Sequence, residues 1–172
     1  MSILEEISTG YRFVRLLEED APSTLRIFNE HVAAGFSAYM EEPAPKSFML
    51  GPIQGAKAHT ALAAETANGA MVGFGLLRPY SPVPTFRETA VTTIFLSADH
   101  TRRGIGSAML REAKPMSIKR VLAHISSQNP DSVAFHRARG FKECGRFQAI
   151  GRKWNRDFDV IWMIKDLSEQ DA

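Results

Sequence analysis

The chain has 172 residues, 44% hydrophobic and 23% charged, with 21 Lys and Arg against 19 Asp and Glu, a formal net charge of +2. This composition is typical of one globular domain spanning residues 1–172, and it excludes a disordered, collagen-like or coiled-coil chain. The small, scattered positive charge argues against nucleic-acid binding, which needs a basic patch. No apolar run approaches the roughly 20 residues of a membrane span, and with a single cysteine, Cys144, we expect a cytoplasmic protein that binds no membrane.

The first half of the chain alternates between strand and helix signals. Residues 11–16 are strand-like, and an acidic stretch followed by a proline then predicts a helix start. Residues 35–58 contain several prolines and glycines, so any helix there is short. The turn signal Asn68-Gly69 predicts a hairpin between strands at 59–66 and 70–77.

The second half continues the alternation. Asn129-Pro130-Asp131 is a well-formed helix start, and Gly140 is a natural end for that helix. Lys114-Pro115 ends the helix before it. The remaining predicted elements are a buried strand at 89–97, a helix at 104–113 and strands at 120–126, 141–150 and 159–164. The predicted order is β-α-(α)-β-β-β-α-β-α-β-β, an α/β fold around one sheet.

The glycine turn Gly104-Ile105-Gly106 follows the buried strand and opens a helix. Backbone N–H groups at such a turn, together with the helix N-terminus, favour an anion, and Arg102 and Arg103 add positive charge. A phosphate-bearing ligand is one interpretation, and a tight turn with solvated arginines is the other. Position 109 is Met and neither glycine precedes a lysine, so the Rossmann and P-loop patterns are excluded.

Three segments in order carry a resemblance to a known family. The segment 102–110 resembles the acetyl-CoA pyrophosphate loop of the GNAT N-acyltransferases. Asn129 to Ser132, with His136 and Gly140-Phe141, resembles the cofactor-contacting segment of the same family. The tail 151–163 resembles the phosphinothricin and methionine sulfone acetyltransferase branch. The implied fold is a single α/β GNAT domain, a mixed and mostly antiparallel sheet flanked by helices.

The resemblance also implies a set of site residues. Backbone groups of the buried strand would pair with the pantetheine arm, and one N–H would polarise the thioester carbonyl. His136 stands where the branch has a histidine, and it would contact the cofactor and protonate the leaving thiolate. The implied cofactor-binding residues are Ile94, Phe95 and Leu96 on the strand, Arg102, Arg103, Gly104, Ile105, Gly106 and Ser107 in the turn, and Asn129, Ser132 and His136 beyond it.

The general base is the point where the chain departs from the branch. Val91 occupies the position of the branch's glutamate, and valine cannot accept a proton. Glu88 is the candidate replacement if a β-bulge changes the facing of the strand. Glu41 and Glu42, in the segment expected to wall the acceptor site, are further candidates. The remaining histidines, His31, His59, His100 and His124, have no metal-ligand spacing, and we interpret them as ordinary surface or core residues with no metal site.

Three functions compete on these observations. The first is an enzyme that transfers acetyl from acetyl-CoA to the amine of a small, amino-acid-like molecule by direct attack in a ternary complex, as a homodimer by resemblance. The second is a non-catalytic acyl-CoA-binding domain, because Val91 replaces the base. The third is an unrelated α/β domain whose glycine turn arose by accident.

Overall fold

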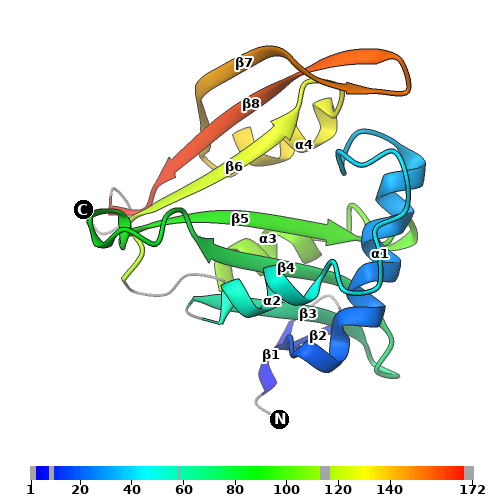
Figure 1. The fold of residues 1–172 in the computed structure, drawn as a ribbon. Coiled ribbons are helices and arrows are strands. Elements are labelled where there is room, and N and C mark those ends of the chain that lie inside the picture. Colours follow the sequence, from blue (N-terminus) through cyan, green and yellow to red (C-terminus); the bar gives the residue numbers. More distant parts are fainter. Residues whose placement is uncertain (1–2, 8–9, 58, 113–116, 169–172) are drawn as a thin grey trace.

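The computed structural model describes residues 3–7, 10–57, 59–112 and 117–168. Its strands form one mixed sheet in the order β1-β2-β3-β4-β5-β6-β8-β7, in which only the β5–β6 pair is parallel (Figure 1). The strands are β1 (Ile3–Ile7), β2 (Tyr11–Arg15), β3 (Thr60–Thr66), β4 (Met71–Pro79), β5 (Thr89–Leu96), β6 (Arg120–Ser126), β7 (Lys142–Lys153) and β8 (Arg156–Asp166), and the helices are α1 (Ala21–Ala34), α2 (Leu50–Ala56), α3 (Ile105–Glu112) and α4 (Pro130–Arg137).

The predicted fold class is confirmed, with two differences in the elements. Strand β1 carries no signal that the sequence analysis used, and it adds an edge strand beside β2. Strands β7 and β8 are longer than predicted, because a tight turn at Trp154 and Asn155 joins them directly, with φ of 49° and 57°. A tryptophan at positive φ is uncommon, so this turn cannot be predicted from the residue types. The predicted helix stop at Lys114-Pro115 lies outside the described residues.

Helices cover both faces of the sheet. On one face, α1 and α2 pack through Ile27 and Ile53 onto Phe74 of β4. On the other face, Ile105 and Met109 of α3 pack against the first strands. No helix in the described segments is long and apolar enough to cross a membrane.

Strands β5 and β6 pair over only three residues. The paired positions are Thr89 with Arg120, Ala90 with Val121 and Val91 with Leu122. Beyond this point, which we call the fork, the two strands diverge (Figure 1). The sheet therefore opens along the second half of β5.

The open edge of β5 exposes backbone groups at alternate residues. The Ser97 N–H donates to Val72 O at 2.8 Å and the Thr89 carbonyl accepts from Tyr80 N–H at 3.1 Å, so odd-numbered residues pair with β4. Because backbone groups alternate along a strand, those of Thr92, Ile94 and Leu96 point to the open side.

A buried lysine ties the C-terminal hairpin to the first helix. The side chain of Lys153, at 0% exposure, donates from Nζ to the carbonyls of Val32, Gly35 and Ala38 at 2.8, 2.6 and 3.0 Å. These are last-turn and following carbonyls of α1, which a cation stabilises. The lysine thereby holds the loop after α1 against the turn between β7 and β8.

We predict that Lys153→Met lowers the free energy of unfolding by about 3 kcal/mol, because three carbonyls lose a charged donor. Urea unfolding of the variant measures this. Lys142→Met, an exposed lysine on the same strand, is the matched control and should change stability by less than about 0.5 kcal/mol. Equal stability of the two variants would contradict a structural role for the buried ammonium.

Candidate active site

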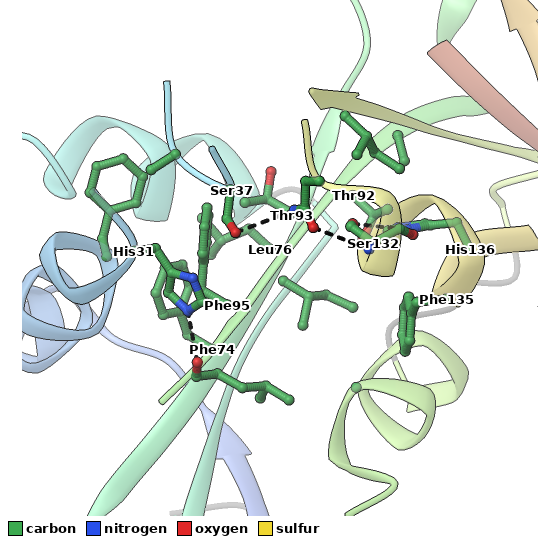
Figure 2. A pocket seen from close by; sticks show the side chains of 18 of the residues that line it. His31, Ser37, Phe74, Leu76, Thr92, Thr93, Phe95, Ser132, Phe135 and His136 are labelled. Atoms are coloured by element: carbon green, nitrogen blue, oxygen red, sulfur yellow. Dashed lines mark hydrogen bonds between the residues drawn. The ribbon is translucent and has the colours of Figure 1, made fainter. Parts of the chain in front are cut away.

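A cleft of about 1000 Å³ occupies the opening between β5 and β6. Its floor is β5, and its walls come from α1 and the loop that follows, α2, the glycine turn, β6 and α4. Figure 2 shows His31, Phe74 and Phe95 on one side of the cleft and Ser132 and His136 of α4 on the other. Ile94, Phe95 and Leu96, predicted from the sequence as cofactor contacts, all line this cleft.

The glycine turn forms one end of the cleft. Arg102 and Gly104 have positive φ, 59° and 81°, and α3 begins at Ile105. The first N–H groups of a helix have no partner within it, so this end of the cleft offers donors to an anion. Of the predicted turn residues, Arg103 is the one that does not line the cleft, because its Nη1 is directed to Tyr11 Oη at 3.4 Å.

Gly106 is required for close packing of α3 against α4. A Cβ atom at this position would lie 3.1 Å from two ring carbons of Phe135, tighter than ordinary van der Waals contact. The guanidinium of Arg139 stacks on the Phe135 ring, 3.8 Å from the ring centroid, and its Nε donates to Ser107 Oγ at 2.9 Å. Arg139 lines the cleft beside the turn, and no motif in the sequence singled it out.

Asn129 and Ser132 form the N-terminal cap of α4. The Asn129 side chain accepts from Ser132 N–H at 3.2 Å, as predicted for a helix cap. Its Nδ2 also donates to Ser37 Oγ at 3.2 Å, which links α4 to the loop after α1. Both residues line the cleft, so capping and ligand contact are compatible.

His136 is neutral near pH 7 in this environment. Burial lowers its pKa, a backbone hydrogen bond to Ser132 opposes that shift, and the charge of Arg139 lowers the pKa further. Its Nδ1–H donates to Ser132 O at 2.8 Å, which leaves the lone pair on Nε2. The ring lies between Phe135 and Phe141. A neutral ring with this tautomer accepts a proton at Nε2 and does not supply one there.

The predicted carboxylate bases lie away from the cleft. Glu88 does not line it, and its side chain pairs with Lys119 at 3.1 Å at the start of β6. Glu41 accepts from the Trp154 N–H at 2.5 Å, and Glu42 is exposed outside the lining. The structure therefore does not bring Glu88 together with the other predicted site residues. Asp131, exposed at the start of α4, is the one carboxylate in the described lining.

In place of a carboxylate, a cluster of three side chains, Arg78, Tyr39 and His124, lies at the fork. Arg78 of β4 is the register partner of Val91. The residue is half-buried, its Nε is buried without a hydrogen-bond partner within the described residues, and no described carboxylate pairs with it. Tyr39 Oη and His124 Nδ1 are 3.1 Å apart, and the His124 ring lies 5.2 Å from that of Trp162. Arg78, Tyr39 and His124 all line the cleft.

The protonation states at the fork follow from burial. Burial raises the pKa of Tyr39 to about 12, so the phenol keeps its proton. Burial, and then the charge of Arg78, lowers the pKa of His124, so the imidazole is neutral at pH 7. The sequence analysis interprets His124 as an ordinary histidine, whereas the structure places it in the lining of the cleft.

Comparisons with known proteins agree with this geometry. Residues 15–141 match the model of the Acetyltransferase (GNAT) family. An L-methionine sulfoximine/L-methionine sulfone acetyltransferase of Pseudomonas paraeruginosa is 25% identical over 154 residues, 86% of this chain and 90% of that protein. A phosphinothricin acetyltransferase structure from Sinorhizobium meliloti, in complex with AcCoA, has a TM-score of 0.83 at 26% identity and covers 92% of this chain and 89% of its own. A ribosomal-protein-alanine N-acetyltransferase from Brucella melitensis has a TM-score of 0.79 at 26% identity, covering 90% and 99%.

We predict that Gly106→Val weakens CoA binding at least about tenfold, because the new side chain must displace Phe135 from the wall of the cleft. Isothermal titration with CoA measures the change. Gly145→Val is the matched control, since a Cβ there meets nothing within 4 Å, and it should bind CoA as the parent does. Parent-like affinity in the Gly106 variant would contradict the assignment of this turn.

Proposed function

The chain belongs to the acetyltransferase (GNAT) family, and we propose that this acyltransferase moves an acetyl group from acetyl-CoA to the amine of a small, amino-acid-like molecule by direct attack in a ternary complex. The observation that carries the proposal is the open edge of β5, which runs from the glycine turn to the fork inside one cleft. Such an edge offers backbone hydrogen bonds to an extended ligand arm, as an added strand would use them.

In this proposal acetyl-CoA lies along the cleft with its pyrophosphate at the glycine turn and its thioester at the fork. The glycine turn, with its free N–H groups, suits the pyrophosphate. From Leu96 back to Thr92 the edge is about 13 Å long at the usual strand rise, and the pantetheine arm would follow it toward the fork. The N–H of Ile94 on this edge would then face the thioester carbonyl and stabilise the charge that develops on its oxygen.

Orientation supplies most of the rate in this proposal. Holding the amine beside the thioester replaces an encounter in solution with a positioned attack. Because the Nδ1–H of His136 is committed to Ser132 O, we assign His136 to contact with the cofactor arm, and water to protonation of the leaving thiolate.

Arg78 supports an acceptor that carries an anionic group. Arg78 lines the cleft at the fork, and its buried Nε has no hydrogen-bond partner among the described residues. A buried donor without a partner is costly, and a ligand carboxylate would satisfy it in a bidentate pair. An amino acid has this group close to its amine.

The alternative function is an acyl-CoA-binding domain without turnover. It is favoured by Val91, which stands where the branch has a catalytic glutamate. Both functions require CoA binding, so only turnover separates them.

We also propose that two copies associate through strand β7. This strand is an edge of the sheet, and its exposed side chains include Phe147 and Ile150, the latter 61% accessible. An exposed apolar edge is a pairing surface. The exposed thiol of Cys144 suits a reducing compartment, which supports the predicted cytoplasmic location.

Sedimentation velocity tests the association. We predict a dimer at micromolar concentration and a shift to monomer in Phe147→Arg, because a charge would be buried in the contact. Lys142→Arg, a conservative change on the same strand, should stay dimeric. A monomer in the unmodified protein would contradict this contact.

The experiment that tests the function is thiol release from acetyl-CoA over a panel of amines. The panel contains methionine sulfone, phosphinothricin, common amino acids, their amides, polyamines and an alanine-initiated peptide. Turnover with amino-acid-like acceptors is the expected result. CoA binding with no turnover on any acceptor would support the binding domain instead.

We predict that Arg78→Met raises KM for an amino-acid acceptor about 10- to 100-fold, the value of a lost charged hydrogen-bonded pair. The KM for acetyl-CoA should stay within about twofold. The variant should also lose the preference for an amino acid over its amide. Retention of that preference would contradict carboxylate recognition by Arg78.

A further inference from the structure

We propose that His124 is the general base of the transfer and that its Nε2 takes the proton which the attacking amine loses. The inference rests on the proposed acetyl transfer and deepens it, because it assigns a residue to the role that Val91 leaves vacant.

The histidines that line the cleft differ in their position and in the contacts that their rings make. His31 lies at the Leu96 end of the cleft, where its Nε2 is 2.7 Å from Leu96 O. His136 lies on α4 between two phenylalanine rings. His124 is on β6, two residues past Leu122, the last residue to pair with β5. It is therefore the histidine at the fork, where the arm of acetyl-CoA would end.

Strand facing puts His124 on the same side of the sheet as Arg78. Val121, Ala123 and Ile125 of β6 point into the core that includes Phe141, so His124 points to the opposite face. Its contact with Tyr39, from the loop after α1, agrees with this facing.

Arg78 lies on the same face, on β4 beside the paired end of β5. Phe74 and Leu76 of β4 pack with the helices on the α1 and α2 face, and Arg78 continues the same alternation. An acceptor whose carboxylate is held by Arg78 would therefore present its amine near His124.

The ring is in the state that a base needs. Burial and Arg78 keep it neutral at pH 7. The charged or titratable groups that face it are Tyr39 from the loop and Arg78 from β4, and Trp162 of β8 adds only an apolar ring. The proposal places the ring proton of His124 on Nδ1, which donates to Tyr39 Oη 3.1 Å away. In that tautomer the lone pair stands on Nε2, which has no hydrogen-bond partner among the described residues.

The step balances without a further reactant. The amine nitrogen forms a bond to the thioester carbonyl carbon, the carbon–sulfur bond breaks, and its electron pair leaves on sulfur. The proton from nitrogen passes to Nε2 of His124, and the sulfur takes a proton from water. The imidazolium then returns its proton to solvent, and the products are an amide and CoA thiol.

The test compares kcat, its pH profile and CoA affinity in the full chain. With an acceptor that the unmodified enzyme turns over, His124→Gln should lower kcat about 100-fold, within the range of a lost general base. It should also remove the acid limb of the kcat profile, which lies at a pH below the ordinary histidine pKa because burial and Arg78 lower the pKa of His124. His124→Ala should recover part of the lost rate when imidazole is added. Both variants should bind CoA within twofold of the parent.

His100→Gln is the matched control, because His100 forms a similar pair with Tyr11, 2.8 Å from Nδ1 to Oη, outside the cleft lining. It should retain kcat within twofold. A His124→Gln enzyme with kcat within threefold of the parent and an unchanged pH profile overturns the inference. Loss of CoA binding in both His124 variants also overturns it, since His124 would then be structural. No turnover by the unmodified protein on any acceptor overturns the proposed function, and this inference with it.

Discussion

The separation of β5 from β6 after three residue pairs is the constraint on which the rest of the site depends. Backbone groups that leave a sheet must find other partners, and burial without them is costly. Here the backbone groups on the open edge of β5 face a cleft that a ligand can enter. The same strand ends in the glycine turn, so a single element sets the distance between the anion site and the fork. A site of this kind depends on backbone geometry more than on special side chains, and solved structures only 26% identical to this chain share its fold.

Local features of the chain were predictable, and features that depend on strand facing were not. The cap at Asn129 and the turn at Gly104 follow from rules that act over a few residues. The positions of Arg78 and His124 depend instead on which face each strand presents at the fork. The bulge in the pairing of β3 and β4 lies between Met71 and Gly73, at the other end of β4, so the strand alternates regularly from Gly73 to Arg78. Which face that alternation presents to the cleft depends on the packing of α1 and α2, which lie far from Arg78 in the sequence. The prediction of Glu88 as base requires a bulge in β5, but β5 pairs regularly with β4.

At the fork, the absence of a carboxylate at position 91 changes what the neighbouring charged and titratable groups can do. Val91 and Arg78 are register partners, so a glutamate at 91 would lie beside a guanidinium. An ion pair there would hold the carboxylate in its charged, weakly basic form and would occupy the group that suits a ligand anion. Valine leaves the guanidinium open, and the neutral imidazole across the fork then carries the proton chemistry.

The buried Lys153 has a consequence for the order in which the molecule assembles. Its three carbonyl partners precede it by 121, 118 and 115 residues. Contacts of such long separation slow folding, because the chain must close a large loop before it gains them. During synthesis, the first helix and its loop leave the ribosome long before the lysine that anchors them. The wall of the cleft is therefore finished late, after strands β1 to β6 have been synthesised and together with the hairpin of β7 and β8.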